Sequence, residues 1–378
     1  MPRDKFLALR YNGSMNSAVW KPGENMTDLR IICNIIFPPD PTAAQAARRN
    51  WDSLAKPLGS LGLLEEAIVR IAALTGSAEI SLSGKSLLVF CADNGVIARG
   101  VTQCGSEVTA AVARALAEGR SSVSPMARLA GCTVVPIDMG IRDFTGHDKV
   151  VSCRIRNGTG DISVGPAMTG AECVKAIEAG IRLAQQQKEA GVRLLAIGEM
   201  GIGNTTTAAA VAASLLDCSP KDIVGRGAGL SDAGLAQKKQ AVADALLLNR
   251  PDPSDPVDVL AKVGGLDLAG MCGAFLGAAL CHVPVLIDGT ISAAAALCAQ
   301  RLCPTAAGAM IASHLPADPA AKLLLDALGL NPLISAGMRL GEGSGAVAAM
   351  PLLDMALAVY NSGQNFEKLG IDPYTRQV

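Results

Sequence analysis

Short apolar runs alternate along the chain with longer segments in which apolar residues recur every three or four positions. Continuous apolar runs predict strands buried on both faces, and the longer segments predict helices. The predicted strands are Ser86–Ala92, Thr133–Ile137, Leu194–Ile197, Val283–Ile287 and Ala309–Ala312. The predicted helices between and around them are Ser106–Ala117, Ser124–Ala130, Ala171–Ala190, Thr205–Leu216, Asp232–Leu248, Leu266–Leu280 and Ser292–Arg301. This alternation predicts an α/β fold, a parallel sheet with helices on both of its faces.

The two ends of the chain carry no strand pattern. Residues 1–25 are polar and aperiodic, and Met26 opens a stretch that reads like a natural protein start, so we expect residues 1–25 to be a disordered extension. Helical patterns lie at Asp40–Lys56, Leu63–Leu74, Pro319–Leu328 and Gly345–Tyr360. We therefore expect residues 26–85 and 316–378 to form a small helical domain beside a large α/β domain of residues 86–315.

The composition narrows the class of protein. The chain has 378 residues and a formal net charge of −1, which gives no basis for nucleic-acid binding. Half of the residues are hydrophobic but only 3% are aromatic, so small aliphatic side chains must form the core. The longest apolar stretch, Ala274–Ile287, is broken by His282 and Pro284 and is too short to span a membrane. The 11 scattered cysteines are expected to be reduced thiols of a cytoplasmic enzyme, and the three isolated histidines give no metal site.

Polar residues follow the predicted strands, at Asp93, Asp138, Glu199, Asp288 and Ser313. The carboxyl ends of parallel strands meet at one edge of a sheet, and open sheets of this kind bind ligands there. The pattern therefore predicts a ligand site at this edge. Taken singly, Asp93 and Asp138 are equally well explained as helix N-caps.

A glycine-rich loop, GEMGIGNTT, joins the third predicted strand to an alanine-rich helix. Its glycines let a ligand approach backbone N–H groups, Asn204 and Thr205 are suitable N-caps, and a helix N-terminus attracts phosphate. A P-loop carries Lys and then Ser or Thr where this chain has Asn204 and Thr205, so a monophosphate is predicted and a nucleoside triphosphate is not. Glu199 would repel a phosphate, so it must take part in chemistry or hold hydroxyl groups.

Two further segments each allow a structural and a functional interpretation, whereas Lys238 is given a structural one alone. Gly225–Gly229, GRGAG, is either a simple loop or a second side of the phosphate pocket. Asp93–Gly95 is either a turn or a ligand-facing loop. Lys238, on a predicted helix, is expected to be solvated.

Glu342 lies between Gly341 and Gly343, just before a long helical pattern. A carboxylate near a helix start is favoured by the helix dipole alone. The flanking glycines favour more than that, because they leave the carboxylate projecting from bare chain and let a flat ligand approach. Such a carboxylate suits the work of a general base.

Seven motifs occur in order over about residues 26–361: ADNGV…GVTQ…EVT, RNGTGDI, GEMGIGNTT, GRGAGLSDAGL, VLIDGTI, ASH and RLGEGSGA. With this set the chain resembles the nicotinate-nucleotide:dimethylbenzimidazole phosphoribosyltransferase family. The resemblance implies transfer of the phosphoribosyl group of nicotinate mononucleotide to 5,6-dimethylbenzimidazole or a related base, giving α-ribazole 5′-phosphate and nicotinate for cobamide assembly. It also implies a Rossmann-like large domain, a small helical domain, a homodimer, and no metal or cofactor.

The resemblance further implies roles for single residues. Glu342 is expected to remove the imidazole proton of the incoming base, and Glu199 to lie near the ribose and assist. The phosphate and ribose are expected to lie against Gly201, Gly203, Asn204, Thr205 and Gly227, with Asp288 approaching the same nucleotide. Further substrate contacts are expected at Ser313, Gly341 and Gly343, and in a pocket for the aromatic base at Thr102 and Ser106.

Three positions depart from the family pattern: Asn94 stands where many relatives have His, Ser106 where Gln is common, and Pro316 where Ser is frequent. The short side chain of Ser106 leads to the hypothesis that the pocket admits a substituted benzimidazole, a purine or a phenolic base. Two other functions compete. A Rossmann-type oxidoreductase fits the strand pattern but lacks a GxGxxG after the first strand, and a nucleotide-binding relative without catalysis is disfavoured by the presence of both glutamates.

Overall fold

The computed structural model describes residues 27–375, so the expected extension of residues 1–25 lies outside the described part of the chain. Six parallel strands form one sheet in the order β3-β2-β1-β4-β5-β6. The strands are β1 (Lys85–Ala92), β2 (Cys132–Gly140), β3 (Val151–Ser152), β4 (Leu194–Met200), β5 (Val285–Ile287) and β6 (Met310–Ala312). The predicted parallel sheet is confirmed. β3 was not predicted, because its two exposed residues carry no apolar run.

The seven helices predicted among the strands are present as α5 (Glu107–Ala117), α6 (Val123–Leu129), α7 (Gly170–Glu189), α8 (Asn204–Leu216), α10 (Asp232–Asn249), α12 (Leu266–Leu280) and α13 (Thr290–Leu302). The chain ends supply α2 (Thr27–Ile35), α3 (Pro41–Ser53), α4 (Leu63–Thr75), α14 (Ala320–Leu328), α15 (Ser344–Tyr360) and α16 (Phe366–Leu369). Four helices were missed, α2 and α16 at the chain ends and α9 (Pro220–Ile223) and α11 (Pro256–Val263) between them, as were the 3-10 turns η2 (Gly95–Arg99) and η3 (Pro304–Ala309). The signal for α11 was present, since Asp255 caps it and Pro256 opens its first turn.

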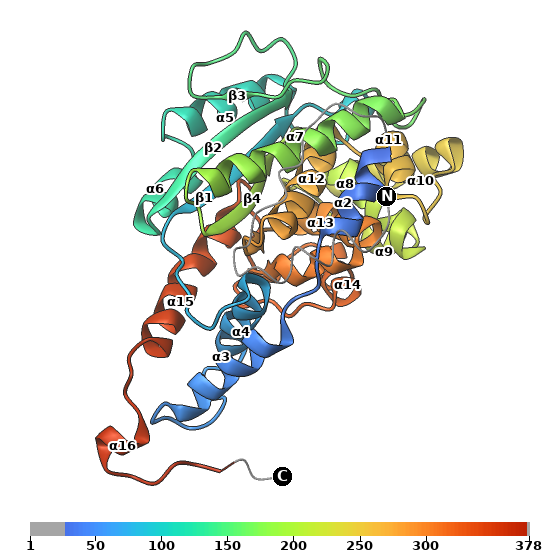
Figure 1. Cartoon of the computed structure of the whole chain (residues 1–378). Coiled ribbons are helices and arrows are strands. Elements are labelled where there is room, and N and C mark those ends of the chain that lie inside the picture. The colour runs from blue at the N-terminus through green and yellow to red at the C-terminus, as the bar shows by residue number, and fades with distance from the viewer. Residues whose placement is uncertain (1–26, 376–378) are drawn as a thin grey trace.

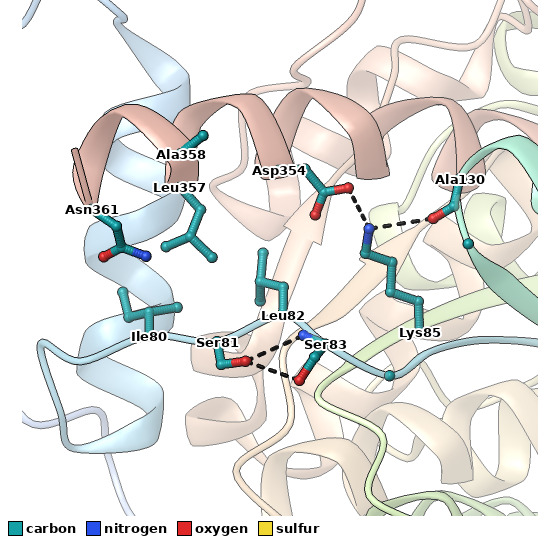
Figure 2. A pocket seen from close by; sticks show the side chains of 12 residues that line it. Ile80, Ser81, Leu82, Ser83, Lys85, Ala130, Asp354, Leu357, Ala358 and Asn361 are labelled. Carbon is teal, nitrogen blue, oxygen red and sulfur yellow. Dashed lines mark hydrogen bonds and ion pairs between the residues drawn. The ribbon is translucent and has the colours of Figure 1, made fainter.

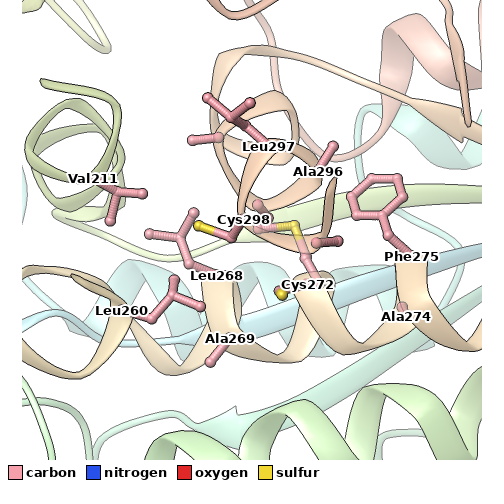
Figure 3. Close-up of a cluster of buried hydrophobic side chains, with 14 of the residues drawn as sticks. Val211, Leu260, Leu268, Ala269, Cys272, Ala274, Phe275, Ala296, Leu297 and Cys298 are labelled. Carbon is pink, nitrogen blue, oxygen red and sulfur yellow. The ribbon is translucent and has the colours of Figure 1, made fainter. Parts of the chain in front are cut away.

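Side chains of β1 alternate between two hydrophobic cores, one on each face of the sheet. Leu88 and Phe90 belong to a core shared with α7, α8, α12 and α13, whereas Leu87 and Val89 belong to a core shared with α4, α5, α6 and α15. Figure 3 shows part of the first core, where aliphatic side chains of α8, α11, α12 and α13 gather around Cys272 and Cys298. The continuous apolar runs of the strands follow from this burial on both faces.

Helices α7 and α12 pack at close range because glycines form the contact. A Cβ on Gly180 would lie 2.0 Å from the carbonyl oxygen of Gly270, and a Cβ on Gly273 would lie 1.9 Å from that of Ile177. Both distances are far below van der Waals contact, so only glycine fits at either position. The glycine content of the chain therefore serves helix packing as well as loops.

Helices α3, α4 and α15, from the two ends of the chain, lie together at one side of the sheet (Figure 1), whereas α2 packs into the core of α12 and α13. Helix α15 runs from the sheet toward α3 and α4, and Trp51 of α3 meets Tyr360 of α15 with ring centroids 5.0 Å apart. Helix α14, which the sequence grouped with them, packs against α8 and α13. Since α4 and α15 share a core with β1, their separation as a small helical domain stays a prediction. Among residues 27–375, no helix combines the length and apolar character that a membrane span requires.

Candidate active site

The order of the strands reverses between β1 and β4, so the carboxyl ends of these two strands form the switch point of the sheet. Glu199, near the end of β4, lies beside Phe90 of β1 in the strand register. Asp93 and Asn94 follow directly after β1. The polar residues that the sequence placed at this edge therefore do meet at the crevice where sheets of this kind bind ligands.

Two of the strand-end carboxylates hold loops. Asp93 accepts hydrogen bonds from Thr109 Oγ1 at 2.6 Å and from the Arg142 backbone N–H at 2.8 Å. Asp138 accepts one from the Ile141 backbone N–H at 2.8 Å and pairs with Arg154 at 2.9 Å. Both side chains are buried, and neither caps a helix, so the N-cap interpretation of these aspartates is wrong although their role is structural.

The Asp93–Gly95 loop is packed inside the protein. Asn94 and Gly95 are buried, and the Gly95 N–H donates to Thr159 Oγ1 at 3.1 Å. A Cβ on Gly95 would lie 2.5 Å from the backbone of Gly160. Asn94 lies behind the glycine loop after β4, since a Cβ on Gly203 would lie 3.2 Å from the Asn94 Cβ. Asn94, which stands where many relatives have His, therefore lies beneath this loop.

Helix α8 begins at Asn204, and its N-cap is Gly203, whose φ of +94° lies in the left-handed region. The predicted N-caps, Asn204 and Thr205, are thus wrong by one and two positions. Gly201 is required for packing, since a Cβ there would lie 2.3 Å from the carbonyl oxygen of Ala92. Buried Asn204 uses its amide to donate to two carboxylates, Glu199 and Asp267, the latter at 3.0 Å. Its side chain therefore faces acidic groups, which leaves the phosphate contact predicted for it without support from the geometry.

The Glu342 loop packs directly on β4. Glu342 has a φ of +59°, a left-handed conformation that is uncommon for a residue with a side chain. A Cβ on Gly341 would lie 2.8 Å from Glu199 Oε1, and a Cβ on Gly198 would lie 2.7 Å from the Gly343 nitrogen. Glu342 Oε2 accepts a hydrogen bond from the Val123 N–H at the start of α6, at 3.0 Å. The fold thus brings the two predicted catalytic glutamates onto touching segments.

Asp288 and Ser313 anchor this arrangement. The Asp288 carboxylate accepts hydrogen bonds from three N–H groups at the start of α15: Gly343 at 3.2 Å, Gly345 at 2.7 Å and Ala346 at 3.1 Å. The Ser313 hydroxyl donates to the carbonyl oxygen of Ile287 at 2.5 Å. Both side chains are buried. Asp288 therefore fixes the loop that carries Glu342, while the substrate contacts expected of Asp288 and Ser313 stay predictions.

The site is strongly acidic. Burial raises the pKa of Glu199 to about 8, against a lowering by its bond from Asn204, and nearby Asp267, Asp288 and Glu342 raise it further. Burial also raises the pKa of Asp267 and of Asp288 to about 6. Asp267 was missed because it lies within a helix that reads as wholly apolar. Carboxyls in this environment favour a ligand that brings positive charge.

The prediction for Lys238 is also wrong. This lysine is 1% exposed, not solvated, and its Nζ donates to Thr205 Oγ1 at 2.8 Å. A Cβ on Gly227 would lie 3.0 Å from Thr205 Oγ1 and 3.2 Å from Lys238 Nζ. Burial lowers the pKa of Lys238 to about 8, and the charge of Asp318 opposes this. The GRGAG loop thus closes over the first turn of α8 with a buried cation beside it.

The predicted base pocket lies on the segment before α5. Thr102 Oγ1 donates to the carbonyl oxygen of Cys104 at 2.7 Å, and Ser106 stands at the N-cap position of α5 without a capping bond. One turn on, Thr109 accepts a hydrogen bond from the Ile202 N–H at 3.1 Å. Gln103 donates to the carbonyl oxygen of Gly229. This segment therefore touches both glycine loops of the site.

A cavity of about 470 Å³ lies elsewhere, at the start of β1. Figure 2 shows Lys85 between Asp354 of α15 and the Ala130 carbonyl, with Ile80, Leu82 and Leu357 lining the hollow. The start of β1 is the opposite edge of a parallel sheet from the carboxyl ends of the strands, so this cavity is separate from the acidic site.

Comparison with known proteins gives a consistent result. A family model described as phosphoribosyltransferase matches residues 36–371. The chain is 44% identical over 331 residues to the nicotinate-nucleotide–dimethylbenzimidazole phosphoribosyltransferase of Acetivibrio thermocellus, covering 88% of this chain and 94% of that protein. It is 44% identical over 347 residues to the enzyme of the same name from Chloroflexus aggregans, covering 92% and 98%. The crystal structure of CobT from Thermus thermophilus superposes with a TM-score of 0.84 and 38% identity, covering 88% of this chain and 100% of that one.

Proposed function

The chain belongs to the family of nicotinate-nucleotide–dimethylbenzimidazole phosphoribosyltransferases, and we propose that it transfers the phosphoribosyl group of nicotinate mononucleotide to 5,6-dimethylbenzimidazole or a related base. The products are α-ribazole 5′-phosphate and nicotinate, which serves the assembly of the cobamide lower ligand. The observation that carries this proposal is the meeting of Glu199 with the Gly341–Gly343 loop at the switch point of the sheet.

The reaction requires a general base, and it requires stabilisation of the positive charge that develops on the ribose. Glu342 takes the N–H proton of the incoming imidazole, and the freed nitrogen attacks C1′ of the ribose from the face opposite nicotinate. The bond from C1′ to the pyridinium nitrogen breaks, and its electron pair leaves with nicotinate, whose ring nitrogen becomes neutral. The leaving group therefore needs no proton, and the work of the protein is to activate the nucleophile.

Glu199 serves the other half of the reaction. Positive charge grows on the ribose as the bond to nicotinate breaks, and a fixed carboxylate beside it stabilises that charge. Burial and the charges of three nearby carboxyls raise the pKa of Glu199. The nucleotide as a whole is an anion, but its pyridinium nitrogen places positive charge directly beside C1′, and the acidic site is complementary to this local charge.

The phosphate binds at the other end of the nucleotide site. We assign it to the buried Lys238, Thr205 and the Gly227 loop, which meet at the N-terminus of α8. A buried ammonium with a single hydrogen-bond partner retains donors for phosphate oxygens, and the helix N-terminus adds a favourable dipole. Gly201 and Gly203 form the loop that leads from Glu199 to this helix. The choice of a monophosphate over a triphosphate stays a prediction from the glycine loop.

The aromatic base enters between the Thr102–Ser106 segment and the Glu342 loop. We keep the hypothesis that Ser106 widens this pocket, because its hydroxyl makes no capping bond and its side chain is short. A helix α5 that starts at this position holds Ser106 at a fixed place on the pocket wall. Exchange of Ser106 should therefore alter the choice of base more than the affinity for the nucleotide.

We also propose that the protein is a cytoplasmic homodimer. All 11 cysteines are free, which fits a reducing compartment. Large apolar side chains are exposed on two neighbouring helices, Met355 of α15 at 63% and Leu129 of α6 at 89%. Such a surface suits a second copy of the chain. Light scattering of the purified protein tests the dimer, and a Met355→Glu variant that stays dimeric would place the interface elsewhere.

One assay tests the proposed reaction. Nicotinate mononucleotide and dimethylbenzimidazole are mixed with the protein, and free nicotinate and α-ribazole 5′-phosphate are measured together. We expect the two products to form in equal amounts and only when both substrates are present. Nicotinate formed without the base would indicate a hydrolase, and no product with any benzimidazole, purine or phenol would overturn the proposal.

A further inference from the structure

Glu199 and Asp267 share a single hydrogen-bond donor. Asn204 Nδ2 donates to Glu199 Oε2 and to Asp267 Oδ2. Two acceptors of one amide nitrogen lie about 5 Å apart by hydrogen-bond geometry. Asp267 is fully buried in the first turn of α12, and its other oxygen accepts from the Leu268 N–H at 2.9 Å. The two carboxyls are therefore linked through one short, buried side chain.

Burial has the largest effect on the pKa of Glu199 and of Asp267, and the nearby charges that raise these two pKa values are those of other carboxyls. The titratable groups that face the pair from neighbouring elements are Cys91 of β1, Asp93 after β1, Asp288 after β5 and Glu342 before α15. All of them are acidic. Two carboxyls at this separation in a dry site do not both ionise readily, so one of them keeps its proton near neutral pH.

We propose that Asp267 is a positioning residue that aims the Glu199 carboxyl at the substrate through Asn204 and, by its own negative charge, keeps that carboxyl protonated until the pyridinium ring of the nucleotide enters. The inference rests on the proposed function. When the pyridinium arrives, its positive charge stabilises the Glu199 anion, and one proton passes from Glu199 to solvent. The proton that leaves balances the pyridinium charge that enters, and the anion stands beside the ribose before the bond to nicotinate breaks.

A purely structural role for Asp267 makes a different prediction. Its bond from the Leu268 N–H and its place in the first turn of α12 also stabilise that helix. Loss of a helix-stabilising carboxylate lowers the melting temperature but leaves the protons exchanged on nucleotide binding unchanged. Proton release therefore separates the two roles.

The experiment is calorimetric titration of the full-length protein with nicotinate mononucleotide at pH 7, in buffers of different ionisation enthalpy, which gives the number of protons released. We expect the wild type to release at least half a proton more with this nucleotide than with α-ribazole 5′-phosphate, which carries the same phosphate without the pyridinium charge. In Asp267→Asn, we expect this excess to fall at least threefold. The limb of the pH–rate profile that reports Glu199 should also move to lower pH by at least about half a unit.

Asp93→Asn is the matched control. Asp93 is also fully buried and also accepts one bond from a side chain and one from a backbone N–H, but it does not contact Asn204. It should keep most of the wild-type proton release, because its charge acts on Asp267 from outside the linked pair and the link through Asn204 stays intact. Asn204→Ser breaks the same link from its other end and leaves the charge of Asp267 in place. Because the bond from Asn204 lowers the pKa of Glu199, we expect the Glu199 limb of the pH–rate profile to move to higher pH in this variant, opposite to its movement in Asp267→Asn. This variant keeps the inference testable if Asp267→Asn fails to fold.

Three outcomes overturn the inference. These are wild-type binding without excess proton release, variants at 267 and 204 that behave as the wild type does, and an equal loss in Asp93→Asn. If the wild-type protein binds nicotinate mononucleotide and releases nicotinate, any of these outcomes overturns the inference but leaves the proposed function standing. If the wild-type protein neither binds this nucleotide nor releases nicotinate, the proposed function itself is overturned.

Discussion

Lys238 offers a sharp test of the phosphate site, because a buried ammonium without an anionic ligand destabilises the folded protein. The change is Lys238→Met, which keeps most of the aliphatic chain and removes the ammonium. In the wild type this ammonium lies 2.8 Å from Thr205 Oγ1 and is 1% exposed. We expect the variant to bind nicotinate mononucleotide much more weakly while its fold stays intact.

The magnitude follows from the burial of the group. Removing one partner of a buried, hydrogen-bonded charge pair costs about 2–5 kcal/mol. Since each 1.4 kcal/mol is a factor of ten, the Kd for the nucleotide should rise at least about 30-fold. The stability of the protein without ligand should move the other way. Burial lowers the pKa of Lys238 from 10.5 to about 8, so the charged form costs the folded state about 3 kcal/mol at pH 7.

The pH dependence gives the same test a second readout. The pKa of the free site is about 8 and bound phosphate raises it, so the affinity of the wild type should fall as the pH rises above 8. Lys238→Met should lack this fall. Titration calorimetry from pH 6.5 to 9.5 measures the affinity, and thermal unfolding without nucleotide measures the stability. Lys239→Met, one residue along α10 and partly exposed, is the control and should change the Kd less than about twofold. Unchanged affinity in Lys238→Met, or an equal loss in Lys239→Met, would refute the reasoning.

Three further predictions concern packing, protonation and specificity. Gly180→Ala should destabilise the protein by about 1–3 kcal/mol in denaturant unfolding, because its Cβ would meet the Gly270 oxygen at 2.0 Å, whereas Gly170→Ala on the same helix meets open space and should be neutral; similar losses would contradict the packing of α7 on α12. The pKa of Asp267 is raised to about 6 in the folded wild type and is lower in the unfolded chain, so the folded protein loses stability as the pH rises from 4 through 6. The free energy of unfolding of Asp267→Asn, relative to the wild type, should therefore rise by up to about 3 kcal/mol over this range. A difference that does not depend on pH would contradict the buried charge. Ser106→Gln should change the ratio of kcat/KM for dimethylbenzimidazole and adenine by at least about tenfold with little change in the KM for the nucleotide; an unchanged ratio would remove Ser106 from the base pocket.

The sequence predicted the elements of the fold well, because strands buried on both faces appear in the sequence as continuous apolar runs. Continuous runs such as Ser86–Ala92 have no other stable place than the centre of a parallel sheet. Boundaries were less exact where glycine geometry decides them. Helix α8 begins one residue before the predicted start because Gly203, and not a polar side chain, provides its N-cap.

The candidate site was predicted in part. The two glutamates stand out because glycines flank them, and the fold places them on touching segments. Lys238 could not be recognised, since a loop about ten residues earlier in the chain packs beside its ammonium, and the charge that acts on it comes from Asp318, far along the sequence. The role of Asp288 as an anchor of α15 likewise depends on partners 55 to 58 positions away. Long-range docking of this kind leaves no local signal in composition or period.

The central claim is that Glu342 removes the proton of the incoming base while the rest of the site holds the nucleotide. Nicotinate release by Glu342→Gln, measured at saturating substrates beside its affinity for nicotinate mononucleotide, tests it most directly. Glutamine can still accept the hydrogen bond from the Val123 N–H, so the loop should keep its place. General-base catalysis contributes about 10²–10⁴-fold, so we predict a loss of turnover of that size with nucleotide affinity within about threefold of the wild type. Turnover at the wild-type rate would contradict the assignment.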